Sequence, residues 1–197
     1  MPRTPDPTKH TEILRQAKDL FMRQGFERTS MEAIAAAAGV SKPTLYRHFA
    51  DKPALFRAVI RHVGGYVESR WPAYAPDEPL VDRLDRFAVS LHGLLFQPSS
   101  LAFVRLVIQE AGRDPVVGET YRELVDEPMT RHLRRAVAET GEVGRKETAA
   151  MAETFLALVR DPWFWSALTT GQIPTARKLA AVRRAALAGV RPLLAAS

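Results

Sequence analysis

The chain of 197 residues contains no cysteine. This absence excludes disulfides, thiolate metal sites and cysteine nucleophiles, and it is compatible with a reducing cytoplasm. No apolar run approaches the roughly 20 residues that a membrane span needs. The first ten residues also lack the apolar core of a secretory signal. We therefore expect a cytoplasmic protein with no membrane partner.

Catalytic patterns are absent as well. The five histidines, His10, His48, His62, His92 and His132, are not paired with carboxylates at metal-ligand spacing. The chain has no glycine-rich loop that cradles a phosphate and no nucleophile elbow. We expect no enzyme activity, no cofactor and no metal site.

The charge is unevenly placed. The whole chain has a formal net charge of +6, from 28 Lys and Arg against 22 Asp and Glu. Residues 1–70 hold 12 basic and 7 acidic residues, a difference of +5, whereas residues 71–197 hold 16 and 15, a difference of +1. A basic excess confined to one segment is typical of a nucleic-acid surface.

That basic segment contains the pattern of two short helices joined by a tight turn. Thr29 and Glu32 have the spacing of a capping box, which predicts a helix start at Thr29. Gly39 can take the left-handed conformation that ends a helix. Ser41 is a favourable N-cap for the next helix, and Pro43 is tolerated in a first turn. The pattern predicts a helix-turn-helix, whose second helix enters the major groove of DNA.

The second helix has two chemically different faces. Leu45 and Phe49 lie four residues apart and should face inward, as should Ala33 and Ile34 of the preceding helix. The remaining positions carry groups that meet phosphates and base edges: Lys42, Thr44, Tyr46, Arg47 and His48. The alternative is that this is only a solvated face, since short capped helices occur in many all-helical proteins.

The rest of the chain is also helical in pattern, so we predict an all-α fold of about nine helices. A three-helix helix-turn-helix domain would be followed by a larger C-terminal helical bundle. Apolar residues recur at helical spacing over residues 8–24, 80–96, 101–113, 116–127, 128–140, 146–169 and 175–194, with a break or kink at Pro162. Gly64 and Gly65 should weaken the helix that follows Asp51. The proline-rich stretch 71–79 predicts a boundary between a DNA-binding domain, 1–70 with an arm at 1–8, and a second domain, 71–197.

Residues 9–60 closely resemble the N-terminal domain of TetR-family (TetR/AcrR) transcriptional regulators. Many spaced positions agree in order, including Gly25-Phe26, Thr29-Ser30-Met31, Ala38-Gly39-Val40-Ser41, Thr44-Leu45-Tyr46 and His48-Phe49. Residues 106–121 resemble the sixth and seventh helices of one subgroup more loosely. The resemblance implies a homodimer that binds a palindromic operator in double-stranded DNA. It also implies a repressor that a small hydrophobic effector releases.

Site residues follow from that resemblance, position by position. Thr29 and Ser30 correspond to phosphate contacts, and Lys52 to a further one. Recognition-helix contacts are implied for Lys42, Thr44, Tyr46 and His48. Arg47 occupies a variable position, where it can read a guanine or contact a phosphate. Two alternatives stay open: the Tyr46 ring can pack against the fold, and Thr29 can act as a cap.

The regulatory half is less specific. A ligand pocket would use aromatic and apolar side chains with a few polar groups, and the candidates are Phe87, His92, Phe96, Phe103, Val107, Tyr121, Trp163 and Trp165. The alternative for this set is an ordinary core, with His92 as a satisfied buried histidine. Apolar stripes on the last two predicted helices suggest a twofold dimer interface of Phe155, Leu156, Val159, Leu168, Leu179, Val182, Leu187, Val190 and Leu193. The alternative is that these residues are buried within one chain.

Two other functions remain possible from the sequence. One is a DNA-binding regulator without any effector. The other is a helical binding module whose basic half meets an acidic partner other than DNA. Salt-dependent binding to one palindromic duplex, in preference to a scrambled one, would separate both DNA-binding hypotheses from the last.

Overall fold

The computed structural model describes residues 7–160 and 163–195, with side chains from 8 to 160 and from 163 to 192. Residues 1–6 of the expected arm, the expected break at Pro162 and the side chain of Leu193 lie outside these residues. Within the described ranges every regular element is helical, which confirms the all-α prediction. They contain eleven α-helical segments and one π-helical turn, more than the nine helices expected, partly because 146–169 forms two helices.

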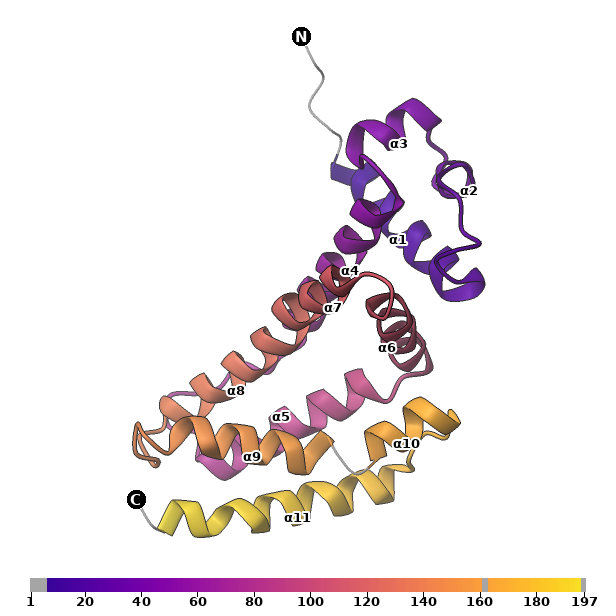
Figure 1. The fold of residues 1–197 in the computed structure, drawn as a ribbon. Coiled ribbons are helices and arrows are strands. Elements are labelled where there is room, and N and C mark those ends of the chain that lie inside the picture. The colour runs from indigo at the N-terminus through magenta and orange to yellow at the C-terminus, as the bar shows by residue number, and fades with distance from the viewer. Residues whose placement is uncertain (1–6, 161–162, 196–197) are drawn as a thin grey trace. The chain divides into compact units, whose positions relative to one another are not determined.

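Two compact units divide the chain (Figure 1). The N-terminal unit comprises the residues up to Tyr66 together with Arg105–Val125. The C-terminal unit comprises Val67–Val104 and the residues from Asp126 onward. The contacts therefore do not follow a single cut at residue 70, because a later segment packs with the first helices.

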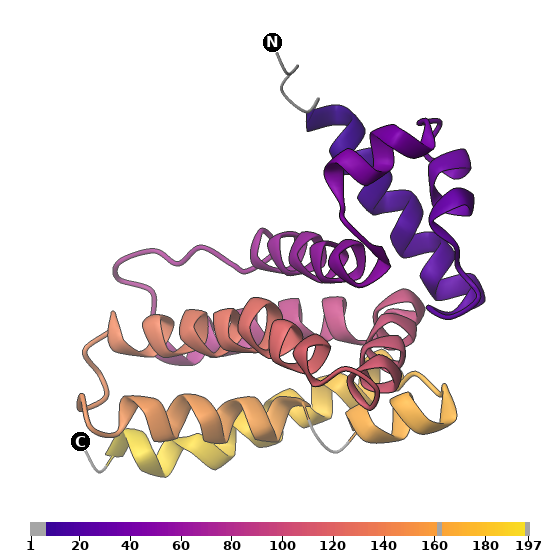
Figure 2. The ribbon, with the colours of Figure 1, turned by 45° about the horizontal axis from the view of Figure 1, so that its top comes forward.

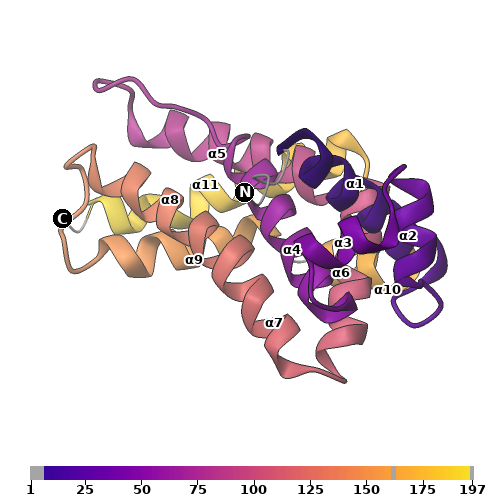
Figure 3. The same ribbon diagram turned by 90° about the horizontal axis from the view of Figure 1, so that it is seen from above.

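The N-terminal unit begins with four helices: α1 (Pro7–Gln24), α2 (Met31–Ala37), α3 (Lys42–His48) and α4 (Lys52–Glu68). Its core is aromatic. The Phe26 ring stacks on Phe21 at 5.5 Å and lies 5.3 Å from Phe56, measured between ring centroids. Phe26 therefore folds back after Gly25, whose φ of 81° ends α1. Phe21 belongs to α1 and Phe56 to α4, and Figure 3 shows α2 and α3 from above.

The second part of this unit comes from the middle of the chain. It includes the end of α6 (Pro98–Ala111), then α7 (Pro115–Tyr121) and the π-helical turn η1 (Arg122–Asp126). The helix continues from η1 into α8 (Glu127–Ala138) without interruption, although two separate helices were expected there. Pro128 lacks an N–H and would clash with the carbonyl of Leu124 in a regular α-helix, and the wider π-helical turn accommodates this defect.

Four helices carry the core of the C-terminal unit: α5 (Leu80–Leu95), α8, α9 (Thr148–Arg160) and α11 (Ala176–Ala195). A short α10 (Trp163–Thr170) precedes α11. Figure 2 shows α9 running beside α11. Leu84, Phe87, Leu133, Phe155 and Val190 are buried together in this core. Trp71, from the segment before α5, stacks on Phe87 at 5.2 Å.

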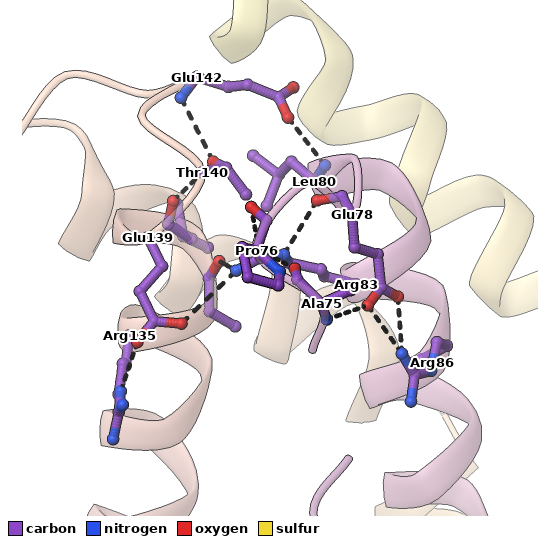
Figure 4. A network of polar contacts seen from close by, with 12 residues as sticks. Ala75, Pro76, Glu78, Leu80, Arg83, Arg86, Arg135, Glu139, Thr140 and Glu142 are labelled. Atoms are coloured by element: carbon purple, nitrogen blue, oxygen red, sulfur yellow. Dashed lines mark hydrogen bonds and ion pairs between the residues drawn. The ribbon is translucent and has the colours of Figure 1, made fainter. Parts of the chain in front are cut away.

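A buried arginine fixes the segment between α4 and α5 (Figure 4). The Arg83 side chain is 1% exposed. Its guanidinium donates to the carbonyls of Ala75 at 2.6 Å, Pro76 at 3.2 Å and Glu78 at 3.0 Å, and to that of Ala136 on α8 at 3.3 Å. The proline-rich stretch is non-helical, as expected, and Arg83 ties it to α5 and α8.

Candidate nucleic-acid interface

The two helices of the candidate interface have well-defined ends. The Ser30 hydroxyl accepts from the Ala33 N–H at 3.1 Å and caps α2. Gly39 has a φ of 63° in the turn that follows. Ser41 then caps α3, accepting from the Thr44 N–H at 3.3 Å, and Pro43 lies in the first turn. The helix-turn-helix geometry is the one expected from these residues.

The expected cap at Thr29 is wrong by one residue. Thr29 is 1% exposed, and its hydroxyl donates to the Gly25 carbonyl at 2.8 Å. This hydrogen bond closes the end of α1 and leaves capping of α2 to Ser30. A buried hydroxyl cannot reach a DNA phosphate, so of the two phosphate contacts predicted at the start of α2 only Ser30 is on the surface.

The faces of α3 are arranged as expected. Leu45 is fully buried and Phe49 is 6% exposed, which fixes the orientation of the helix. Lys42, Tyr46 and Arg47 are exposed on the opposite face, whereas Thr44 and His48 are half-buried. The His48 ring lies 5.6 Å from that of His10 on α1. Tyr46 is 42% exposed, and the Lys42 ammonium lies 5.9 Å from its ring centroid.

A carboxylate also lies on this surface, and the sequence interpretation missed its role. Glu32 in the first turn of α2 pairs with Lys42, at 2.5 Å between Oε1 and Nζ. Both side chains are more than half exposed, at 55% and 58%. We expected Glu32 to complete a capping box. Its ion pair with Lys42 joins two helices across the turn, and no spacing rule in the sequence indicated that pair.

Lys52 differs from its expected role as a phosphate contact. Its ammonium donates to the carbonyls of Phe26 at 2.8 Å, Thr29 at 3.0 Å and Glu27 at 3.2 Å. An ammonium has three N–H groups, so all of them are engaged. The Phe26 ring also lies under the ammonium, 4.5 Å from its centroid. The geometry gives Lys52 the role of holding the turn between α1 and α2.

We expect Lys52→Ala to lower the free energy of unfolding by about 2 kcal/mol, because three carbonyls lose a charged donor. The salt dependence of DNA binding should stay unchanged. Urea unfolding and binding titrations at several salt concentrations measure the two quantities. A phosphate contact at Lys52 would instead reduce the salt slope by about one, and that result would restore the original assignment.

The predicted pocket residues are divided between the two units. Phe87 is fully buried in the core of the C-terminal unit, against Trp71. Trp165 is 60% exposed, which argues against a role in lining a pocket. Trp163 is half-buried, and the Lys178 ammonium lies 4.3 Å from its ring centroid. Val107 and Tyr121 belong to the N-terminal unit.

His92 is a polar group on the buried face of α5. It is 4% exposed, its Nε2 lies 3.0 Å from the Val159 carbonyl, and the Phe96 ring contacts it edge-on at 5.6 Å. Its Nδ1 is buried and has no hydrogen-bond partner in the part of the chain that the structure describes. Burial lowers the pKa of His92 and favours the neutral ring, whereas its hydrogen bond to Val159 acts in the opposite direction. The ring is therefore only half satisfied, unlike an ordinary core histidine.

Most of the predicted dimer residues are buried inside one chain, so their assignment to an interface with a mate is corrected. Exposure is 7% or less for Phe155, Leu156, Val159, Leu168 and Val190. Leu179, Val182 and Leu187 are half-buried. The apolar stripes of α9 and α11 are packing faces, but they pack against each other and against α5 and α8 in the same chain. The exposed outer faces of α9 and α11 carry small residues and Leu158, at 42% exposure, together with the charged residues Glu153, Arg177, Lys178, Arg184 and Arg191.

No single helix among residues 7–160 and 163–195 has the length and apolar composition to cross a membrane. Only α5 and α6 taken together meet such a test, and they are bent by 74°.

Comparisons with known proteins agree with this geometry. Residues 13–59 match the family model of bacterial regulatory proteins of the tetR family. Residues 82–196 match the model described as AefR-like transcriptional repressor, C-terminal domain. The transcriptional regulator UidR of Escherichia coli strain K12 is 29% identical over 153 residues, which is 76% of each chain.

Solved structures extend the match to nearly the whole chain. The flavonoid-responsive regulator FrrA is 32% identical, with a TM-score of 0.78 over 92% of this chain and 94% of that chain. A TetR transcriptional regulator from Agrobacterium tumefaciens is 26% identical, with a TM-score of 0.75 over 95% and 94%. With its DNA-binding helix-turn-helix and a second family match over more than half of its length, the chain belongs to the TetR family of transcriptional regulators.

Proposed function

We propose that this protein is a sequence-specific repressor that leaves its operator when a small hydrophobic effector binds. The observation that carries the proposal is the polar face of α3, held outward by the burial of Leu45 and Phe49. The description of the C-terminal family model as a repressor domain supports the direction of regulation.

The DNA contacts are assigned to the surface residues of α2 and α3. Ser30 at the start of α2 and Lys42 at the start of α3 contact phosphates. Tyr46, Thr44 and His48 contact the backbone or base edges. Arg47, exposed near the end of α3, reads a base, because a guanidinium can donate to both acceptors of a guanine.

Two copies are required for a palindromic operator, because their recognition helices must enter major grooves about 34–36 Å apart. The mate packs on the outer faces of α9 and α11, through Leu158 and the small residues Ala157, Ala185 and Ala188, all exposed in one chain. Small side chains allow helices to approach closely, and this face replaces the buried stripes of the sequence interpretation.

The effector is a small apolar compound with at least one polar group. The half-satisfied His92 supports this chemistry, since its Nδ1 can hydrogen-bond a ligand hydroxyl. Phe96, which contacts the His92 ring, provides apolar surface at the same place. FrrA responds to flavonoids, so a flavonoid is a suitable first probe. An effector weakens operator binding only by its differential affinity for the two states, typically about 1–3 kcal/mol.

Selection of bound sites from a random duplex pool, at two salt concentrations, tests the DNA-binding part. We expect a palindromic site whose affinity falls steeply with salt. Repeating the selection with Arg47→Ala should cost roughly 1–3 kcal/mol and relax preference at one base pair in each half-site. A flavonoid added to the complex should release the duplex.

Several results would count against the proposal. Equal affinity for selected and scrambled duplexes would refute sequence-specific binding. Equal losses on all duplexes would assign Arg47 to a phosphate. A complex that stays intact with every apolar compound tested would favour the regulator without an effector.

A further inference from the structure

The candidate interface contains a carboxylate, Glu32, next to the Lys42 ammonium. Glu32 and Lys42 come from different helices and meet across the turn, with 2.5 Å between Oε1 and Nζ. Their exposure, at 55% and 58%, means that a phosphate arriving at α3 can approach both groups. No element of the fold needs this contact for its core, because neither side chain is buried.

Both groups are charged at neutral pH. The Lys42 ammonium beside it lowers the pKa of the Glu32 carboxyl, and the carboxylate raises the pKa of Lys42 in return. Hydrogen bonding to its own backbone and to Ser30 also lowers the pKa of the Glu32 carboxyl. Lys42 has a long flexible stem, so the ammonium is the partner that can move.

We propose that Glu32 competes with DNA phosphate for Lys42 and thereby determines how strongly the protein discriminates its operator from other DNA. This inference rests on the proposed DNA-binding function. On a non-cognate duplex the carboxylate keeps the ammonium and repels nearby phosphates. On the operator, contacts from the rest of α3 bring a phosphate close enough to take the ammonium.

The energies permit such an exchange. An exposed ion pair contributes little free energy, so it can be broken by a well-placed phosphate. One phosphate neutralised by Lys42 adds about 0.9 to the slope of log affinity against log salt for duplex DNA. While the pair is intact, the slope of log affinity against log salt should therefore be smaller by roughly one in non-specific complexes.

The test is the variant Glu32→Gln in the full chain, measured on the selected duplex and on a scrambled duplex across several salt concentrations. We expect affinity for the scrambled duplex to rise about two- to five-fold, with a salt slope steeper by about one. Affinity for the selected duplex should rise less, so the specificity ratio falls. Circular dichroism should show unchanged helix content, since Glu32 is exposed.

Two controls make the result specific. Glu123→Gln removes the same charge from an exposed, ion-paired glutamate on η1, at 59% exposure, and it should leave the ratio unchanged. The Lys42→Gln variant has no ammonium for Glu32 to hold. In this background, Glu32→Gln should therefore raise affinity for the scrambled duplex less than it does in the wild-type chain. An undiminished rise in that background would overturn the competition for Lys42.

Other outcomes are equally decisive. A loss of affinity confined to the selected duplex would make Glu32 a base reader that accepts from a cytosine N4 amine, and it would overturn the proposal. If the wild-type protein prefers its selected duplex while Glu32→Gln and Glu123→Gln behave alike, only the inference fails. If the wild-type protein shows no preference at all, the proposed function fails with it.

Discussion

Arg83→Met should lower the free energy of unfolding by about 4 kcal/mol, the largest effect we expect from any single change in this chain. The guanidinium is 1% exposed and donates to four backbone carbonyls. It also lies 3.6 Å from the Glu139 carboxylate. Methionine preserves an unbranched side chain but supplies no donor, so the buried Ala136 carbonyl and three part-buried carbonyls lose a charged hydrogen-bond donor. Urea unfolding followed by circular dichroism measures the loss.

Arg86→Met is the matched control, one helical turn away. Arg86 is 50% exposed and pairs with Glu78, at 2.8 Å to each carboxylate oxygen. Exposed pairs contribute up to about 1 kcal/mol, so this variant should lose far less. Equal losses for the two variants would show that burial of Arg83 is not the source of the effect.

Gly64→Ala should destabilise the protein by about 3 kcal/mol, because added methyl groups in a tight contact force the backbone to shift. A Cβ on Gly64 would lie 2.2 Å from the Leu124 carbonyl oxygen, which belongs to η1. That oxygen is backbone, so no side chain rotation can relieve the clash. The thermal unfolding midpoint should fall accordingly.

The neighbouring glycine offers the opposite result. A Cβ on Gly65 would meet nothing within 4 Å, and the residue is exposed. Gly65→Ala should raise the free energy of unfolding by about 0.5–1 kcal/mol through helix propensity. We expected both glycines only to weaken α4. If both variants lowered the midpoint equally, the contact with Leu124 would not explain the first.

Local rules predicted much of the fold. Helix ends at Gly25, Gly39 and Ser41 depend only on the local backbone and on nearby hydrogen bonds, so the sequence spacing was enough to predict them. The inward face of α3 followed from Leu45 and Phe49 in the same way. The Thr29 cap failed because two adjacent hydroxyls compete, and only the burial of Thr29 decides between them.

Long-range contacts explain the other differences. The Lys52 bonds reach carbonyls 23 to 26 residues away, and no local pattern indicates them. An apolar stripe such as Phe155 and Val159 indicates that something covers the helix, but not whether the same chain does so. The candidate pocket residues could not be assigned to one unit from the sequence, because helical spacing does not show which aromatic side chains share a unit.

The chain crosses between the two units three times, which constrains how they can move. The chain passes from one unit to the other after Tyr66, after Val104 and after Val125. The second passage lies inside α6 and the third inside the π-helical turn. Any reorientation of the units must therefore be absorbed by torsions at all three passages together. The π-helical turn departs from regular α-helical hydrogen bonding, a feature common at functional sites.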